Sequence, residues 1–198
     1  MALEPIPKST LHLVIDMQRL FAEETAWHTP AIRTILPNVV RLSRERLAET
    51  LFVKFVVPQR AEDAKGRWKN YYRRWSMVTG EMLAPGMLDL VEPLAMLAGT
   101  DAQVEKETFS VFGAPGFAER LDASGIDTLV FSGVETDVCV HASVLDAIDL
   151  GFRVIVAVDA VASGSETAHA MVFEHLLPRF AEQLEIASTQ AILDAWSS

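Results

Sequence analysis

Residues 128–140 read TLVFSGVETDVCV, and this stretch decides the fold. Its first four residues form an apolar run, rich in branched side chains and too short for a helix, which predicts a buried strand. An amphipathic stretch at 137–150 follows, with Thr136 or Asp137 as the expected N-cap. It ends before Gly151, where a left-handed C-terminal cap favours glycine. A buried strand leading directly into a helix is typical of a parallel α/β sheet.

The same alternation continues along the chain. Five more short apolar runs predict strands, at 11–15, 51–57, 102–104, 154–158 and 184–187. The amphipathic stretches between and after them predict helices, at 31–49, 87–98, 115–124, 165–181 and 189–196. No repeat, low-complexity tract or linker divides the chain. The sequence therefore predicts a single three-layer, doubly wound α/β domain over residues 1–198.

Composition excludes several classes of function. The chain has 198 residues, and its net charge of -10 argues against a nucleic-acid partner, whose binding site would be basic. A single cysteine makes no internal disulfide, and residues 1–10 lack the basic and apolar regions of a signal peptide. No apolar stretch approaches the roughly 18 residues that cross a membrane. We expect a cytoplasmic protein without a membrane partner.

Three polar residues lie where chemistry is expected, just beyond the carboxyl ends of predicted strands. Asp16 ends LHLVID, Lys106 ends AQVEK, and Cys139 follows TLVFSGV in the first turn of the next helix. Taken singly, an Asp there is often a cap, a Lys a solvated edge residue, and a lone Cys buried filler. Together they supply a nucleophile, a base and a stabilising charge.

The roles expected for these residues follow from thiol chemistry. A thiol attacks as its thiolate, so the helix N-terminus and Lys106 are predicted to lower the pKa of a partly accessible Cys139. Asp16 is expected to take the thiol proton and return it to a leaving amine. The backbone N–H groups of Glu135 and Cys139 are predicted to form an oxyanion hole, a contribution of roughly 3 kcal/mol per donor.

The elements IDMQ (15–18), KETFSVF (106–112) and GVETDVCV (133–140) together resemble the isochorismatase-like cysteine hydrolases, which include nicotinamidases and N-carbamoylsarcosine amidases. The resemblance covers about residues 11–187. It implies that Asp16, Lys106 and Cys139 are a catalytic triad, and that six parallel strands are ordered 3-2-1-4-5-6. It also implies a cis peptide bond before Glu135. We expect the protein to act on a small-molecule substrate without a cofactor.

Departures from the family pattern narrow the function. Arg19 and Leu20 replace the Asn and Asp of the common DxQNDF opening, and the Asp-x-His metal ligands of nicotinamidases are missing, so no metal is expected. Isochorismatases cleave a vinyl ether without a cysteine nucleophile, so Cys139 favours hydrolysis of an amide, ureide or carbamoyl C–N bond. A vinyl ether hydrolase and a non-catalytic ligand-binding member stay as alternatives. A dinucleotide or phosphate binder is disfavoured because its glycine motifs are absent.

The histidines are weighed as rivals of Asp16, since cysteine is more often paired with histidine. His141 lies two residues past Cys139 and should point away from the thiol on a helix. His169 and His175 fall on the predicted helix at 165–181, where packing or capping is the expected role.

Residues 58–80 show no clear periodicity and are basic and aromatic, which indicates an ordered, functional loop. Within it, the segment 60–75 is predicted to form a wall of the site and select a small substrate with an acidic group. Burial in the interface of a homo-oligomer, a dimer or tetramer, is an equal alternative. The candidate substrate-binding residues are Phe21, Arg60, Trp68, Tyr72, Arg73 and Trp75.

Overall fold

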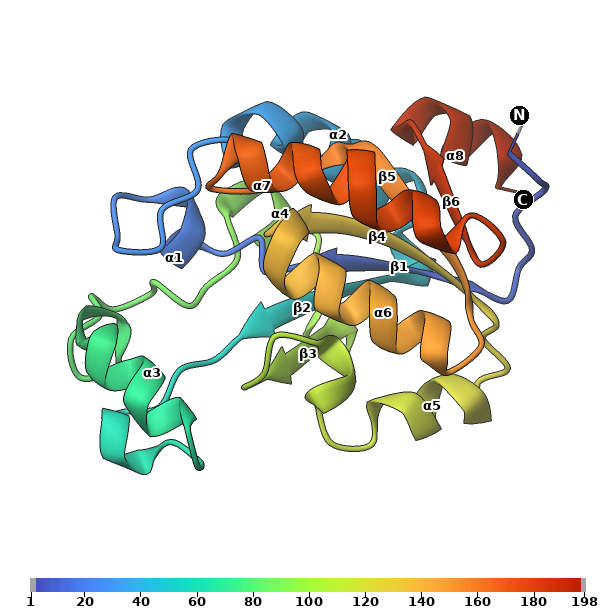
Figure 1. The fold of residues 1–198 in the computed structure, drawn as a ribbon. Helices are drawn as coiled ribbons and strands as arrows, with labels where there is room; N and C mark the ends of the chain where they lie inside the picture. Colours follow the sequence, from blue (N-terminus) through green and yellow to red (C-terminus); the bar gives the residue numbers. More distant parts are fainter. Residues whose placement is uncertain (1–2, 197–198) are drawn as a thin grey trace.

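The computed structural model describes residues 3–196 and contains a six-stranded, all-parallel sheet in the order β3-β2-β1-β4-β5-β6 (Figure 1). The predicted fold class and strand order are therefore confirmed. Between β1 and β4 the order of connection reverses, and ligands bind at such a point in open α/β sheets. The strands are β1 (Thr10–Ile15), β2 (Thr50–Phe55), β3 (Gln103–Lys106), β4 (Thr128–Val134), β5 (Arg153–Ala162) and β6 (Leu184–Ala187).

Helices cover both faces of the sheet and make three layers (Figure 1). One face carries α5 (Phe117–Ala123), α6 (His141–Asp149) and α7 (Glu166–Met171); the other carries α2 (Ile32–Glu45), α4 (Glu92–Ala95) and α8 (Thr189–Ala195). Beyond the carboxyl ends of the strands lie α1 (Arg19–Ala22) and α3 (Trp68–Arg74). Two π turns, Thr136–Val140 and Val172–Leu176, and short 3₁₀ turns complete the elements; the latter are Leu47–Glu49, Ala61–Asp63, Ser76–Val78, Thr100–Ala102, Val111–Gly113 and Leu177–Phe180.

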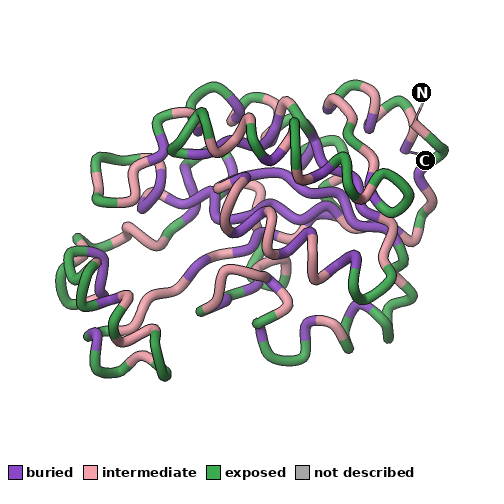
Figure 2. Tube along the Cα trace, in the orientation of Figure 1, coloured by how far each residue is buried: buried purple, intermediate pink, exposed green. Residues whose placement is uncertain are grey.

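The sheet is the centre of the core because both of its faces are covered. All seven residues of β4 are buried, and Figure 2 shows the buried colour running through the central strands. Strands buried on both faces are almost continuously apolar, which is why short branched runs predicted them. No helix of the described residues is long and apolar enough to span a membrane.

A polar exception sits inside the central strand. His12 of β1 is fully buried, and its Nδ1 and Nε2 lie 3.2 Å from Thr50 Oγ1 and 2.7 Å from Ser132 Oγ. The Thr50 hydroxyl already donates to the Arg46 carbonyl, so it accepts a hydrogen bond from His12 Nδ1, and the Ser132 hydroxyl donates to Nε2. His12 is therefore a neutral link between three strands, and burial lowers its pKa to about 3.

Two predicted helices were wrong in extent. Of the helix predicted at 87–98 only α4 forms, because the backbone of Met87 and Asp89 accepts hydrogen bonds from the amides of Leu20 and Arg19. The stretch is thus tied to the loop after β1 and is not free to form helical hydrogen bonds. The helix predicted at 165–181 is divided into α7, a π turn and a 3₁₀ turn.

The absence of periodicity assigned to residues 58–80 was also wrong. Trp68, Tyr71, Tyr72 and Trp75 have the i, i+3, i+4, i+7 spacing of a helix face, and the structure forms α3 there. This segment lies beyond the carboxyl end of β2 (Figure 1). The expectation of an ordered segment is confirmed.

Candidate active site

The fold brings the three candidate catalytic residues to one edge of the sheet. Asp16 directly follows β1, Lys106 ends β3, and Cys139 lies in the π turn after β4. The Nζ of Lys106 donates a 2.8 Å hydrogen bond to Oδ2 of Asp16, and both side chains are fully buried. A buried ion pair at the topological switch point is a candidate for chemistry.

The length of the lysine side chain explains this contact. β1 and β3 lie on opposite sides of β2, so their backbones are about 10 Å apart. The Lys106 stem spans this gap, with Nζ 4.5 Å from the centroid of the Phe55 ring at the end of β2. Nζ also donates a hydrogen bond to the Thr108 carbonyl, at 3.1 Å. Three partners thus hold the ammonium group in place.

The environment of the thiol corrects one expectation. Cys139 is 5% exposed. Burial raises the pKa of its thiol well above the usual value, and the negative charge of Asp16 raises it further. Lys106 acts in the opposite direction but does not outweigh them. The prediction of a partly accessible thiol with a lowered pKa was therefore wrong. The physical reason is that the sequence showed the helix N-terminus and the lysine but did not show the desolvation.

Asp16 has the properties of a base for this thiol. Burial raises the pKa of Asp16, whereas the charge of Lys106 lowers it. Its Oδ1 accepts no hydrogen bond from the described residues, and Cys139 is near enough to lower the pKa of this carboxyl in addition to Lys106. Transfer of the thiol proton to Asp16 leaves the net charge of the buried trio at zero. The thiolate then replaces the carboxylate as the single negative charge beside the Lys106 ammonium.

The turn that carries the thiol departs from the predicted capping. Glu135 is the N-cap residue, and the chain continues as a π turn before α6. Neither predicted cap is available, because Asp137 accepts a hydrogen bond from Ser163 and the Thr136 hydroxyl lies 2.9 Å from Nδ1 of His169. Helix α6 ends as predicted, with Gly151 in the left-handed conformation.

A glycine and a cis peptide bond shape the approach to this turn. Gly133 has a φ of 106°, and a Cβ placed there would lie 2.0 Å from the carbonyl oxygen of Ile15 in β1. Only glycine fits at this distance. The Val134–Glu135 peptide is cis, as the family resemblance implied. That the Glu135 and Cys139 amides hold an oxyanion stays a prediction.

A side chain from one loop and a backbone amide from another fix the Glu135 side chain. Its Oε1 accepts hydrogen bonds from the Thr29 hydroxyl at 3.0 Å and from the Gly164 amide at 2.8 Å. Thr29 precedes α2, and Gly164 follows β5. The turn after β4 is thus connected to the loops after its two neighbours, β1 and β5.

An aromatic cluster lies beside Lys106. Trp27 lies 5.8 Å from Phe55 and 5.9 Å from Tyr71, and Trp68 lies 5.2 Å from Tyr71 and 4.8 Å from Phe109 between ring centroids. Because Phe55 also contacts the Lys106 ammonium, the cluster borders the buried ion pair. Its members are Phe21, Trp27, Phe55, Trp68, Tyr71, Tyr72 and Phe109.

The structure places only half of the candidate substrate-binding residues in this cluster, namely Phe21, Trp68 and Tyr72. The side chain of Arg60 is 63% exposed and paired with Asp63. That of Arg73 is 58% exposed and paired with Glu62. Trp75 is covered by Arg74, whose guanidinium carbon lies 5.1 Å from the ring centroid. Arg73 projects outward because α3 is amphipathic and its aromatic face packs inward.

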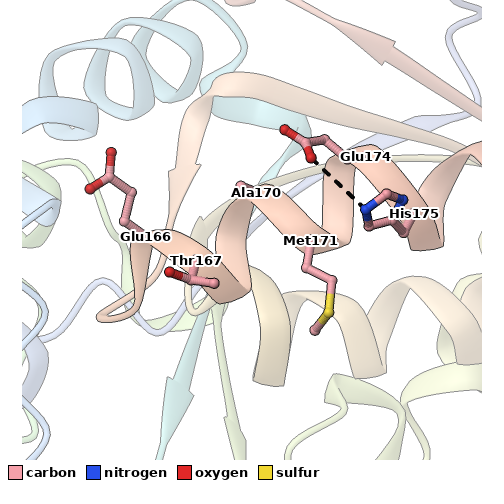
Figure 3. Close-up of a pocket in the computed structure, with 6 residues that line it drawn as sticks. All are labelled: Glu166, Thr167, Ala170, Met171, Glu174 and His175. Atoms are coloured by element: carbon pink, nitrogen blue, oxygen red, sulfur yellow. Dashed lines mark ion pairs between the residues drawn. The ribbon is translucent and has the colours of Figure 1, made fainter.

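Two hollows in the surface are not lined by Asp16 or Cys139. One, of about 290 Å³, lies between residues of the stretch 58–72 on one side and Glu107 and Thr108 on the other. These two residues directly follow Lys106. The other, of about 480 Å³, lies along α7 and the following π turn, between Glu166 and His175 (Figure 3). Its walls come from one helical segment, which makes it a surface groove.

The sequence motifs pointed to some residues without giving their roles. Gln18 is fully buried; its Nε2 donates to the carbonyls of Phe55 and Leu88, and its Oε1 accepts from the Phe55 amide. It therefore holds the ends of β1 and β2 together beside Asp16.

The helical spacing of Tyr71 was the signal that could have placed it in the site. His141 is half-buried, and its Nδ1 has no hydrogen-bond partner among residues 3–196.

Among the described residues, no three or more His, Cys, Asp or Glu side chains cluster in a way that could hold a metal ion. Two of the three rivals of Asp16, His169 and His175, are engaged elsewhere. His169 packs on Phe173 at 5.0 Å, and His175 lies 4.0 Å from the exposed Glu174.

Comparisons with known proteins agree with this fold. Residues 10–188 match the family model of the isochorismatase domain, so the chain belongs to the isochorismatase family. A probable inactive nicotinamidase of Arabidopsis thaliana is 32% identical over 82% of this chain and 85% of its own length. Nicotinamidase 3 of the same plant is 26% identical over 90% and 85%.

A similar solved structure is that of a cysteine hydrolase from Pseudomonas syringae pv. phaseolicola. Its TM-score is 0.81, with 23% sequence identity, over 98% of this chain and 96% of that chain. At this identity the likeness supports the fold alone.

Proposed function

We propose that this protein is a metal-independent cysteine hydrolase that cleaves a C–N bond of a small amide, ureide or carbamoyl compound through a thioester on Cys139. The observation that carries the proposal is the buried Lys106–Asp16 pair beside the thiol, with Asp16 Oδ1 free to accept a proton. Family membership supports hydrolysis, and the relative named nicotinamidase 3 supports an amide substrate.

In the proposed first step, Asp16 removes the thiol proton as Cys139 sulfur bonds to the substrate carbonyl carbon. The carbonyl oxygen becomes an oxyanion, held by the backbone amides of Glu135 and Cys139. Asp16 then gives its proton to the substrate nitrogen, the C–N bond breaks, and ammonia or an amine leaves. Lys106 keeps the buried charge of Asp16 compensated while the proton is away from it.

The second step regenerates the thiol. Water adds to the thioester carbonyl while Asp16 accepts a proton from it, and the C–S bond then breaks. The proton on Asp16 returns to the Cys139 sulfur, and an acid is released. Because burial keeps the pKa of the thiol high, the proton is readily recovered after each turnover.

The test is ammonia release from a panel of primary amides, ureides and carbamoyl compounds, with denaturing mass spectrometry of the quenched reaction. We expect turnover, and a mass increase on the single cysteine that matches the acyl group. Cys139→Ala should abolish both. Turnover by Cys139→Ala would contradict the proposal. So would a metal that co-purifies with the protein and whose removal by a chelator abolishes the activity.

A non-catalytic ligand-binding role is the second candidate, because one relative is named as probably inactive. The intact Asp16, Lys106 and Cys139 constellation favours catalysis in this chain. The same panel separates the two roles, since a binding protein would be stabilised against heat by a ligand without turning it over.

A further inference from the structure

The buried ammonium group of Lys106 has three N–H donors to satisfy. Lysine carries no acceptor, and no part of this side chain reaches solvent. Asp16 Oδ2 at 2.8 Å and the Thr108 carbonyl oxygen at 3.1 Å accept two hydrogen bonds from Nζ. Among residues 3–196 no other oxygen or nitrogen accepts from it. The group left to face the third donor is the Phe55 ring, whose centroid lies 4.5 Å from Nζ.

The register of the sheet places Phe55 beside this ammonium group. Phe55 and Lys106 are partners in the pairing of β2 with β3, and partner residues of neighbouring strands direct their side chains to the same face. Phe55 is 2% exposed, so water does not compete for the ring or for Nζ. The attraction between a cation and a ring face is strongest in such a desolvated contact. An aliphatic side chain at position 55 would leave one buried N–H without an acceptor.

Gln18 fixes the backbone that carries the ring. Its Oε1 accepts a 2.7 Å hydrogen bond from the Phe55 amide, and its Nε2 donates to the Phe55 carbonyl at 3.0 Å. The Gln18 amide in turn donates to the Asp16 carbonyl oxygen at 2.8 Å. Trp27 packs on the ring at 5.8 Å with the two planes nearly perpendicular, which limits its rotation. A closed circuit of contacts thus crosses the ends of three strands and consists of Asp16, Lys106, Phe55 and Gln18.

We infer that Phe55 is a positioning residue: the face of its ring is the third acceptor of the Lys106 ammonium and holds this charge on Asp16. An aromatic side chain is therefore required at position 55, and the electron density of the ring matters as well as its size.

The consequence for catalysis rests on the proposed function, in which Asp16 acts as the base. The titratable groups that act on Asp16 are Lys106 at the end of β3 and Cys139 in the π turn, and both lower its pKa against the effect of burial. If the ammonium group is held less firmly, the pKa of Asp16 rises further. The base is then protonated, and inactive, up to a higher pH.

Fluorinated phenylalanines separate the electron density of the ring from its size. Each fluorine draws density from the ring face and adds little volume, so 4-fluoro-, 3,5-difluoro- and 3,4,5-trifluorophenylalanine in place of Phe55 should weaken the contact in steps. We expect the urea midpoint to fall in that order. For the trifluoro ring the unfolding constant should be about 10-fold larger, which corresponds to about 1.4 kcal/mol.

Phe52 provides the matched control. It is a fully buried ring on the same strand, and no cation lies over it in the part of the chain that the structure describes. The same three replacements at Phe52 should leave the urea midpoint nearly unchanged. Equal losses at positions 55 and 52 would overturn the inference.

The same series in Asp16→Asn/Lys106→Met, which lacks the buried charges, completes a double-mutant cycle. Fluorination also alters the contact of Phe55 with Trp27, and that effect is present in both backgrounds. We expect the graded loss to vanish without the ammonium group. An equal loss in both backgrounds would show that the ring does not act through Lys106. If the double variant does not fold, the comparison with Phe52 decides alone.

The pH dependence of hydrolysis tests the consequence for the base. With the trifluoro ring at position 55, the acid limb of kcat/KM should move up by about half a pH unit or more. Phe55→Leu should move it at least as far, whereas Phe55→Tyr keeps a ring and should restore most of the shift. A fall in kcat/KM that is uniform across pH would indicate packing alone and would reject the positioning role.

The stability measurement needs no substrate, so the inference and the proposed function fail separately. A graded loss of stability at Phe55 with no turnover by the wild type would reject the hydrolase and retain the role of the ring. Turnover by the wild type, with equal losses at positions 55 and 52, would reject the inference and leave the proposed function standing.

Discussion

The Nζ of Lys106 and the Oδ2 of Asp16 lie 2.8 Å apart, and neither side chain reaches solvent. Each charge is stable in this position because the other is present. Removal of one member of a buried pair leaves an uncompensated charge, at a cost of about 3–5 kcal/mol. We therefore expect Lys106→Met to lower the free energy of unfolding by about that amount at pH 8, measured by urea denaturation.

The loss should be smaller at pH 5. Without Lys106, which lowers the pKa of Asp16, burial raises that pKa further above its unfolded value. The folded state then binds a proton more tightly than the unfolded state, so stability falls as the pH rises through this range. The double variant Asp16→Asn/Lys106→Met, with no buried charge here, is the control and should lack this pH dependence. A single variant as stable as the wild type at pH 8 would show that the pair is not needed for folding.

His12 predicts a separate dependence on acid. Its pKa is about 3 in the folded protein and near 6.5 in the unfolded chain, because burial disfavours the charged ring. Stability from the neutral ring is fully present above pH 6.5 and is lost as the pH falls toward 3. The slope should reach about 1.4 kcal/mol per pH unit.

Chemical denaturation from pH 7.5 to 4 measures this slope. In His12→Gln, whose amide can both donate and accept, the contribution of this residue should vanish. His175→Gln alters an exposed ring and should keep the wild-type slope. An unchanged slope in His12→Gln would show that other groups govern the acid response.

Gly133 predicts a strict steric requirement. A methyl group there would lie 2.0 Å from the Ile15 carbonyl oxygen, which belongs to the neighbouring central strand and cannot move aside. Gly133→Ala should therefore lose more than about 4 kcal/mol of stability or fail to fold. Gly99→Ala is the matched control, because nothing lies within 4 Å of its Cβ position and its φ is -66°. Circular dichroism and solubility of the two proteins decide the matter.

Much of the fold could be predicted because a parallel sheet buries both faces of its strands. That burial requires short apolar runs, such as the one ending at Phe131, and they mark the strands in the sequence. Strand ends were less accurate: β5 continues to Ala162 through a register shift against β4. Such an irregularity depends on neighbouring strands, which local periodicity does not describe.

The chemistry of the site was predicted unevenly, for a physical reason. Residue type and position after a strand were enough to select Asp16, Lys106 and Cys139. The direction of the thiol's pKa was wrong because desolvation depends on the surrounding packing. The charge count of segment 60–75 did not show that Arg73 is exposed and paired with Glu62, since a count does not tell which helix face a residue occupies. The anionic preference of the segment stays a prediction.

The last prediction concerns the reactivity of this thiol. In the wild type, burial and the charge of Asp16 both raise the pKa of Cys139, while Lys106 lowers it. Iodoacetamide reacts with the thiolate, so labelling at pH 7.5 should be much slower than that of free cysteine. Asp16→Asn removes the neighbouring negative charge and leaves Lys106 free to stabilise the thiolate. The variant should therefore be labelled several-fold faster, while its ammonia release falls by about 100-fold or more because the base is lost.

Because the chain has a single cysteine, mass spectrometry of the intact protein reports this site alone. Labelling rates across pH 6 to 10 distinguish a change in pKa from a change in accessibility. A lower pKa moves the midpoint of the profile to lower pH, whereas greater exposure raises the rate at every pH. A profile whose midpoint in Asp16→Asn equals or exceeds that of the wild type would mean that Asp16 does not hold the thiol in its protonated form, and the proton transfer proposed between them would have to be abandoned.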